Sequence, residues 1–386
     1  DPGEIILMNM SLAYRDFKWD GSDGESTIDF DDIRLDQASI RIRNLKSNEY
    51  GITAMVSDLK FTEKSGFKLS KLDAKLTVDT STTRFEDLKL ETPFTKLLGM
   101  FEMNYSDASD FEDFISKVEM KADLENSTLN SKDVSFFASE FSGTSVELDI
   151  KGQIKGTVDN LRGKNLDLRY GENTRIRGSV SMTGLPYIDE TYFDLKIEEL
   201  KTNFNDLARL PKIPVNGTDK IELPSEINSL GIIEVDGKFN GFLSDFVAYA
   251  NFQTAIGFFS SDVNFKVNSG SSDALYSGHI SASELDLGKI SGLTNELGKS
   301  TFKLEIKGKG LDRQHLNATL VGNISALQAY GYNYQSIDLN GKFKDKVFEG
   351  KLNVDDPNLS MDFTGLIDMK SKRPSYVFNV EMYEAK

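Results

Sequence analysis

The chain has 386 residues, of which 39% are hydrophobic and 27% charged, and its formal net charge is −16. This composition excludes a disordered chain, and acidic charge spread along the chain without a basic block argues against binding to nucleic acid or to an anionic membrane surface. Because cysteine is absent, disulfides, iron–sulfur clusters and thiolate zinc sites are also excluded.

Apolar and polar residues alternate with a period of two along the chain, which predicts strands that each carry one apolar face. In chain order, the clearest runs lie at residues 72–78, 146–154, 302–306, 316–324, 348–354, 359–363 and 376–382. Short turn-forming segments between such runs indicate hairpins, and therefore an antiparallel meander of about 24 strands. Examples of these segments are residues 20–21, 162–164, 171–173 and 355–357.

Helical periodicity is confined to short segments, which are too short to be stable alone and are expected to cap the ends of the sheet. They lie at residues 107–116, 131–141, 203–210 and 288–297. The run at 146–156 resembles those at 233–241 and 302–310, so tandem units of about 80 residues are predicted. Glycines in these runs are interpreted as points where a strand bends or bulges, with simple termination at turns as the alternative.

Together these patterns predict an all-β fold. We expect an elongated, curved, mostly antiparallel β-sheet folded into a half-pipe (β-taco-like), with a hydrophobic groove and a few short helices. Residues 1–210 are expected to form the first half of this groove, with possible sub-modules 1–105 and 106–210. Residues 211–224 are predicted to be an irregular linker containing proline, and residues 225–386 the second half of the same groove.

No catalytic signature is found, so the chain is predicted to be a non-enzyme without a catalytic residue, metal or cofactor. The segment 292–300 resembles a phosphate-binding loop, but five residues separate its glycines where the motif needs four. A helix C-cap at Gly298 is the better interpretation. Carboxylates are too numerous to single out a glycosidase pair, which leaves a carbohydrate-active β-helix as an alternative.

His279 and His315 lack partners at metal-ligand spacing and are predicted to lie on polar strand faces. The densest acidic clusters lie at residues 20–25 and 29–32. We interpret them as a solvated hairpin turn and the polar face of a strand, with a calcium site as the alternative.

The apolar side of the alternating runs is predicted to line a groove for lipid, open from the first module to the last. An ordinary sandwich or solenoid core with no room for a ligand is the alternative. The candidate lining residues are Leu148, Ile150, Ile154, Val180, Met182, Leu195, Ile197, Val235, Phe239, Phe265, Phe302, Leu304, Ile306, Leu320, Ile324, Phe343, Leu352, Val354, Met361, Phe363, Phe378 and Val380.

Several segments resemble a known family. Residues 28–33 (IDFDDI), 59–72 (LKFTEKSGFKLSKL) and 85–93 (FEDLKLETP) are similar to the translocation and assembly module TamB proteins of Bacteroidetes, within the wider AsmA-like group. Residues 160–168 (NLRGKNLDL) and 338–343 (DLNGKF) have a similar character. These motifs are structural repeat patterns and carry no catalytic residues.

The resemblance implies that the chain is an internal segment of a long periplasmic protein. An N-terminal helix outside this chain would anchor that protein in the inner membrane, and regions outside it would reach an outer-membrane partner of the Omp85 type. The resemblance also implies a lipid-accessible apolar interior, and roles in outer-membrane protein assembly and in moving phospholipid between membranes.

The favoured hypothesis is passive conduction, in which phospholipid acyl chains lie on the apolar face while head groups project from the open edge. Burial of apolar surface can hold such a lipid without directed polar contacts. We expect a monomer that binds no nucleic acid. The alternatives are a structural or adhesive β-rod with a dry core, and a chaperone-like scaffold that lends a strand edge to β-barrel substrates.

Overall fold

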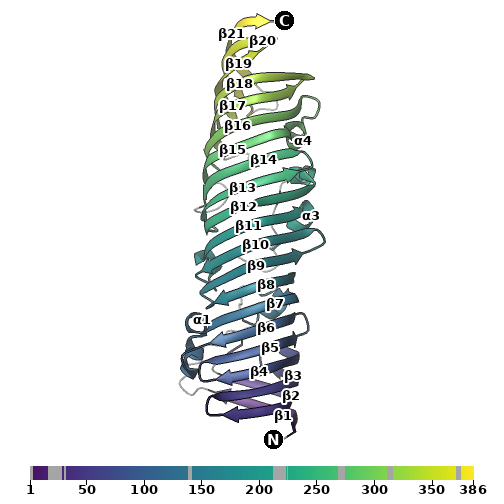
Figure 1. Cartoon of the computed structure of the whole chain (residues 1–386). Helices are drawn as coiled ribbons and strands as arrows, with labels where there is room; N and C mark the ends of the chain where they lie inside the picture. Colours follow the sequence, from purple (N-terminus) through teal and green to yellow (C-terminus); the bar gives the residue numbers. More distant parts are fainter. Residues whose placement is uncertain are drawn as a thin grey trace. The chain divides into compact units, whose positions relative to one another are not determined.

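The computed structural model describes residues 3–15, 28–29, 32–137, 141–211, 223, 225–267, 274–310, 316–370 and 375–386. These residues form 21 strands and a few short helices, and consecutive strands within each unit pair antiparallel, which confirms the predicted fold class. The whole chain is drawn in Figure 1, and its internal contacts divide it into two compact units. Unit 1 comprises Asp1–Thr191 and Asn205–Glu222, and unit 2 comprises Tyr192–Phe204 and Leu223–Lys386.

Unit 1 is a meander in which each strand is hydrogen-bonded to the next along the chain. Its strands are β1 (Glu4–Arg15), β2 (Asp32–Asn48), β3 (Gly51–Glu63), β4 (Lys68–Asp79), β5 (Thr82–Glu91), β6 (Lys96–Asn104), β7 (Glu119–Asn130), β8 (Glu147–Gly156), β9 (Asn160–Tyr170) and β10 (Thr174–Thr183). Its short helices are η1 (Ala108–Asp113), α1 (Phe114–Lys117), α2 (Ser131–Val134) and η3 (Ile188–Glu190).

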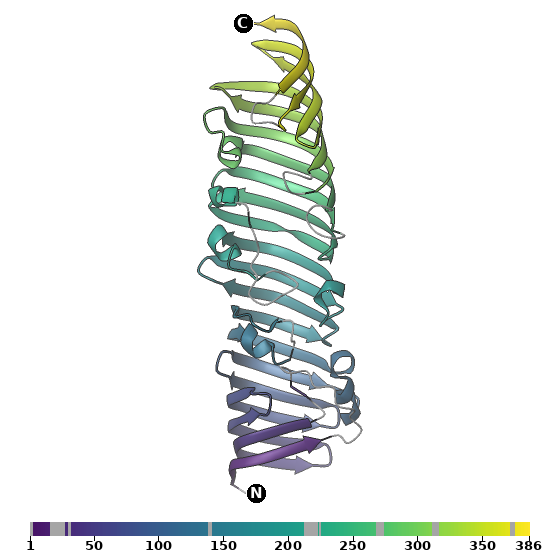
Figure 2. The same ribbon diagram turned by 180° about the vertical axis from the view of Figure 1, so that it is seen from behind.

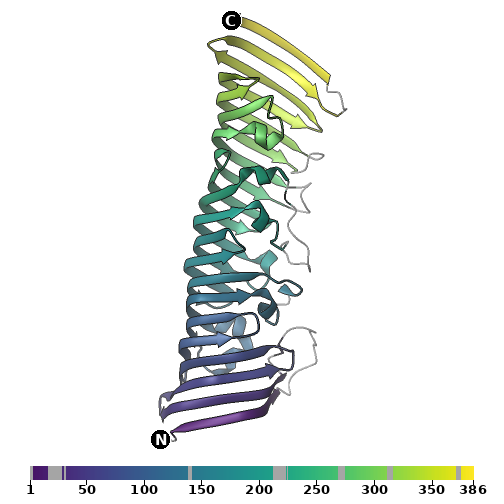
Figure 3. The ribbon, with the colours of Figure 1, turned by 90° about the vertical axis from the view of Figure 1, so that its right-hand side faces the viewer.

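Unit 2 follows the same rule, and Figure 3 shows its strands succeeding one another in chain order. Its strands are β11 (Tyr192–Asn203), β12 (Ile232–Phe242), β13 (Asp245–Thr254), β14 (Gly257–Lys266), β15 (Leu275–Asp286), β16 (Leu297–Lys309), β17 (Asn317–Ala329), β18 (Tyr332–Lys344), β19 (Val347–Asp356), β20 (Leu359–Asp368) and β21 (Ser375–Ala385). The helices are η4 (Ser225–Leu230) and α4 (Leu287–Ser291), and α3 (Phe204–Leu207) lies at the division between the units. The last strands curve strongly in Figure 2.

The predicted elements compare well with those observed. All seven alternating runs fall on strands, and all four helical segments contain a short helix. Figure 1 shows α1 and α4 beside the ends of strands in their own units, as expected for caps. The described residues form 21 strands rather than the expected number of about 24. The turn at residues 20–21 lies outside the described residues, as does most of the predicted linker at 211–224.

Two local predictions are wrong. Residues 162–164 lie inside β9 rather than in a turn, because Gly163 pairs with Ile154 on β8 and with Val180 on β10. Pairing on both sides therefore overrides a turn-like local sequence. The glycine that caps α4 is Gly292, which has a left-handed φ of 78°, whereas Gly298 already belongs to β16.

Glycines allow the strands to bend where neighbouring backbones approach closely. Gly152 in β8 has a φ of +138°, and a Cβ atom there would lie 2.8 Å from the carbonyl oxygen of Asn165. Gly278 in β15 has a φ of +151°, and its Cβ would lie 2.0 Å from the carbonyl oxygen of Asp262. Both glycines lie within strands, so the bending interpretation is confirmed at these positions.

We expect the Gly152→Ala substitution to lower the free energy of unfolding by about 1–3 kcal/mol, because alanine is strained at this φ and meets the Asn165 carbonyl. Urea denaturation followed by circular dichroism measures the change. Gly3→Ala is the control, since a Cβ at Gly3 has no atom within 4 Å and should change stability by less than about 0.5 kcal/mol. Equal effects of the two substitutions would contradict this role for Gly152.

Candidate functional site: the apolar faces of the two units

The pairing register places all candidate residues of unit 2 on one face of its sheet. Residues directly opposite each other in a ladder share a face, so the pairs Leu195 with Phe239 and Ile306 with Leu320 identify that face between β11 and β17. The further pairing of Phe363 with Val380 extends it to β21. We call this surface the unit 2 apolar face.

The candidates of unit 1 also share a face, which we call the unit 1 apolar face. Ile154 and Val180 both lie opposite Gly163, while Met182 lies opposite Leu161. The same row continues toward the N-terminus, because Ile154 pairs with Ala122. Alternation along β8 then brings Leu148 and Ile150 to this side.

Most candidate residues are only partly buried, although they are apolar. Leu304 and Val354 are buried, at 9% and 4% exposure, and Phe378 is 59% exposed. All the others have intermediate exposure. A second layer packed on the same face would leave its side chains buried, as in a sandwich. Much of the apolar surface of both units is therefore accessible.

Aromatic residues that the sequence analysis did not select complete the unit 2 apolar face. Phe246 on β13 lies between two candidates, with its ring centroid 4.6 Å from that of Phe239 and 5.0 Å from that of Phe265. Phe252 and Phe259 form a second stacked pair at 4.4 Å. The alternation of residues 246–252 and 259–265 was the signal that could have revealed them.

Glycines on the unit 2 apolar face make room for aromatic rings that lie across the sheet. A Cβ at Gly341 would be 2.5 Å from the ring of Phe348, which also lies 2.8 Å from the corresponding position at Gly350. A Cβ at Gly308 would lie 2.5 Å from the ring of Tyr276, and burial raises the pKa of this tyrosine. The rings thus lie over the glycines and form an apolar floor on this face. Glycines that only ended strands at turns would not have this role.

The unit 1 apolar face is densely packed near β3 to β5. Its buried cluster contains Val56, Leu69, Leu72, Ala74 and Leu88. Apolar surface is therefore less accessible in this part of unit 1, and a lane open from the first module to the last stays a prediction.

An aromatic cover lies beside this cluster. The ring of Phe67 is 5.6 Å from that of Phe136 and 5.3 Å from that of Phe137, in edge-on geometry. Phe136 and Phe137 follow α2 and lie about 70 residues after Phe67 in the sequence. Ring contacts therefore hold this distant segment against the strands. The adjoining buried cluster is packed like a core that has no space for a ligand.

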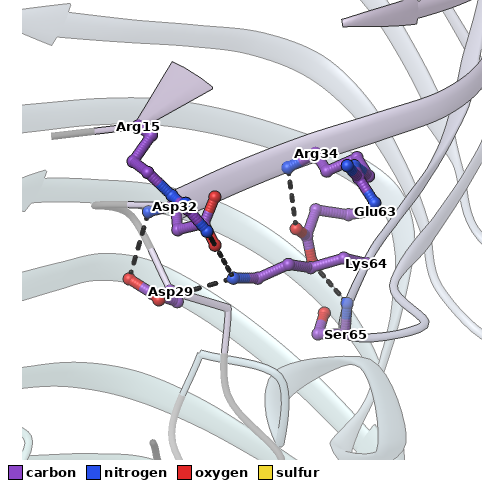
Figure 4. Close-up of polar contacts among 7 residues, drawn as sticks. All are labelled: Arg15, Asp29, Asp32, Arg34, Glu63, Lys64 and Ser65. Carbon is purple, nitrogen blue, oxygen red and sulfur yellow. Dashed lines mark hydrogen bonds and ion pairs between the residues drawn. The ribbon is translucent and has the colours of Figure 1, made fainter. Parts of the chain in front are cut away.

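Polar residues outside the apolar faces form ion pairs between neighbouring strands and turns. Figure 4 shows Lys64, whose Nζ lies 2.8 Å from Asp32 and 3.5 Å from Asp29, while Arg15 binds the same Asp32 at 3.1 Å. The hydrogen bond from Arg15, followed by that from Lys64, lowers the pKa of Asp32 to about 2. These cations therefore pair with Asp29 and Asp32, the acids of the predicted cluster at 29–32 that the structure describes, whereas Asp31 lies outside the described residues.

The nearby Glu63 has a backbone role. Figure 4 shows its carboxylate accepting hydrogen bonds from the backbone N–H groups of Arg34, at 3.4 Å, and Ser65, at 2.7 Å. The side chain is buried, so these bonds satisfy it at the turn between β3 and β4.

No cluster of three or more potential metal ligands occurs among the described residues. His279 lies exposed on β15, which confirms its predicted position, while His315 and the acidic cluster at 20–25 lie outside the described residues. In the same part of the chain, no helix is both long and apolar enough to cross a membrane.

Comparison of the chain with models of protein families, with curated proteins and with solved structures gives no match.

Glu102 is a buried carboxylate on the polar side of β6, with only 3% of its side chain exposed. It accepts hydrogen bonds from the amide of Asn104 and the Nζ of Lys121, both at 2.9 Å, and pairs with Arg84. The Asn104 hydrogen bond is the largest influence on its pKa, and together with the two cations it outweighs burial and lowers the pKa to about 2.

We expect Glu102→Gln to cost on the order of 3 kcal/mol at neutral pH, as the pKa depression from 4.5 implies. A depressed pKa stabilises the fold above the unfolded value, so the difference between the two proteins should shrink as pH falls from about 4.5 toward 2. Denaturation at several pH values measures it. The control Glu234→Gln breaks an exposed pair with Lys201 and should cost less than about 1 kcal/mol. A stability difference for Glu102→Gln that does not change with pH would contradict the lowered pKa of Glu102.

Proposed function

We propose that the chain binds phospholipid acyl chains on its apolar faces and lets them move along each sheet. The observation that carries this proposal is the partial exposure of an apolar face that the register maintains from β11 to β21 in unit 2. Water-exposed apolar surface of this extent is unusual in a folded protein unless a ligand or partner covers it.

Energetics support acyl chains as the ligand. Burial of apolar area contributes about 25 cal/mol per Å², so an acyl chain that covers about 200 Å² of apolar surface gains on the order of 5 kcal/mol without a directed polar contact. The floor formed by Phe348 over Gly341 and Gly350 offers similar chemistry at successive strands. A ligand held by uniform contacts can move between neighbouring positions with little change in free energy.

The resemblance to TamB-type proteins gives this activity a cellular setting. We propose that the chain is a periplasmic segment of a protein anchored in the inner membrane, serving phospholipid transport to the outer membrane, outer-membrane protein assembly, or both. Contacts with an Omp85-type partner would be made by regions outside this chain. Neither catalysis nor a cofactor is required, because the proposed step forms and breaks no covalent bond.

A dry structural rod is the second candidate, and the packed cluster of unit 1 favours it locally. Val56, Leu72 and Leu88 are each buried to 7% exposure or less, and the rings of Phe136 and Phe137 lie beside them. In unit 2 the buried cluster is smaller, with Ile256 and Leu285 among its members. Lipid is therefore expected on unit 2 in preference to the region of β3 to β5.

Phe246→Glu and Val247→Glu test the proposal on adjacent residues of β13. Phe246 lies on the unit 2 apolar face between Phe239 and Phe265, whereas Val247 lies on the opposite face and is 47% exposed. A carboxylate on the apolar face should repel acyl chains, since desolvating it is costly. We expect phospholipid that co-purifies with the chain, measured by mass spectrometry, to fall by roughly tenfold or more in Phe246→Glu and to remain unchanged in Val247→Glu.

Circular dichroism of both variants checks that the strands persist. Absence of phospholipid from the unsubstituted chain would favour the dry rod. Equal amounts of co-purified phospholipid in the two variants would contradict the proposal that the unit 2 apolar face binds lipid. Photo-crosslinking from position 265 distinguishes the remaining alternative, because a chaperone-like scaffold would yield crosslinks to unfolded β-barrel proteins instead of lipid.

A further inference from the structure

A hollow of about 850 Å³ lies in unit 1, and its charged side chains come from the polar side of the sheet. Strands β7, β8 and β9 supply most of its lining, and α1, which precedes β7 in Figure 1, supplies one lysine. Its lining residues are Met100, Lys117, Glu119, Lys121, Ala122, Asp123, Gln153, Ile154, Lys155, Gly156, Thr157, Asn160, Arg162 and Lys164. We call this site the basic hollow.

Cations outnumber acids in the basic hollow, although the chain as a whole carries a net charge of −16. The five cationic side chains are those of Lys117, Lys121, Lys155, Arg162 and Lys164, and the two carboxylates are those of Glu119 and Asp123. The excess of positive charge is therefore local and set by the folding of the sheet, because these residues are spread over nearly fifty positions of the sequence.

Three of these cations already have carboxylate partners. Their Nζ atoms lie within salt-bridge distance of acids: Lys117 at 3.2 Å from Asp113, Lys121 at 2.9 Å from Glu102, and Lys155 at 3.1 Å from Glu119. The remaining acid of the hollow, Asp123, accepts a hydrogen bond from the Gln153 amide at 3.2 Å.

Arg162 and Lys164 remain without a carboxylate partner among the described residues. Both are exposed, and they lie two positions apart on β9, so their side chains leave the same face of the strand. Among the described residues, no carboxylate lies within salt-bridge distance of either cation.

The register also brings three cations of the hollow into one row, of which Lys121 and Lys155 have carboxylate partners and Arg162 has none. Lys155 on β8 lies directly opposite Lys121 on β7 and directly opposite Arg162 on β9. Like charges in such positions, about 5 Å apart, destabilise a sheet. An anion in the hollow would relieve the repulsion along this row of three cations.

We propose that the basic hollow binds a phosphate group carried by a polar ligand. A phosphate ester with a charge of about −1.5 to −2 matches two unpaired cations. The planar guanidinium of Arg162 can bind two phosphate oxygens at once, and Lys164 adds a point charge. The amides of Gln153 and Asn160 add neutral donors for the rest of the ligand.

The size and lining of the hollow narrow the ligand further. About 850 Å³ exceeds what a bare phosphate needs and lies in the range of small-molecule sites. Ten of the fourteen lining residues are polar or charged, so a polyol or a similar polar group attached to the phosphate would find hydrogen-bond partners there. Glycerol phosphate has this chemistry, both as a free compound and as the head-group portion of a phospholipid at a membrane surface.

The charged side chains of the hollow leave the opposite face of the sheet from the proposed acyl-chain surface, although Ala122 and Ile154 of the unit 1 apolar face also contribute to its lining. Arg162 and Lys164 flank Gly163 on β9, and it is Gly163 that belongs to the unit 1 apolar face. Since neighbouring residues of a strand point to opposite faces, the two cations lie on the polar face. The loss of phosphate binding and the loss of acyl-chain binding can therefore be measured independently of each other.

The test is a calorimetric titration of the full chain with glycerol 3-phosphate at low ionic strength. We expect the double substitution R162Q/K164Q to weaken binding at least about tenfold. The control K342Q/K344Q removes two exposed lysines with the same spacing on β18, outside the hollow, and should change the affinity by less than about twofold. Added salt should weaken binding by the unsubstituted chain.

A second arm identifies the source of the phosphate. The chain and both double variants are floated with phosphatidylglycerol vesicles, and with phosphatidylcholine vesicles as a charge control. Binding of glycerol 3-phosphate supports a soluble ligand. Flotation with phosphatidylglycerol that R162Q/K164Q alone abolishes, without binding of the free compound, supports a lipid head group. Binding in neither arm, or equal losses in the two double variants, overturns the proposal. Co-purified phospholipid should be the same in R162Q/K164Q as in the unsubstituted chain, which separates this result from the acyl-chain proposal.

Discussion

The register of the antiparallel ladders is the constraint on which the rest of this structure depends. Side chains alternate between faces, so a slip of one residue in any pair would exchange the apolar and polar sides of every later strand. Hairpins between consecutive strands limit such slips, and buried carboxylates fix some of the turns. Asp206 accepts a hydrogen bond from the backbone N–H of Asn173 at 2.7 Å, and Asp356 accepts one from the Tyr332 hydroxyl at 2.7 Å.

Partial exposure of the apolar faces follows from an architecture in which each unit pairs its strands in a single series. Apolar residues such as Phe239 and Ile306 contact neighbouring side chains of the same sheet face. They remain partly exposed to solvent. Where an additional segment does cover the face, as Phe136 and Phe137 do beside Phe67, buried packing results. The chain therefore contains both a packed region, which contributes stability, and accessible apolar surface.

The polar faces show how a strongly acidic chain places its cations. Many are paired across strands, as in the contacts of Lys75 with Glu86 and of Lys266 with Asp245. Exposed pairs of this kind contribute little stability each, but they keep the outer surface hydrophilic. The basic hollow departs from this arrangement, because three cations occupy directly opposed positions and two of its charges lack an acid. Its charge excess arises from strand pairing rather than from any basic segment of the sequence.

The sequence by itself determined the strands, their apolar sides and the short helices, because period-two alternation is a local property that survives in almost any antiparallel sheet. It also indicated that runs such as 302–306 face the same side as 348–354. Only the tertiary structure decided that residues 162–164 continue a strand, since pairing of Gly163 on both sides outweighs its local turn preference. Exposure of the apolar faces, the stack around Phe246 and the cations gathered by β7, β8 and β9 likewise depend on which strands are neighbours. Contacts between residues far apart in the chain set these features, and one-dimensional periodicity contains no information about them.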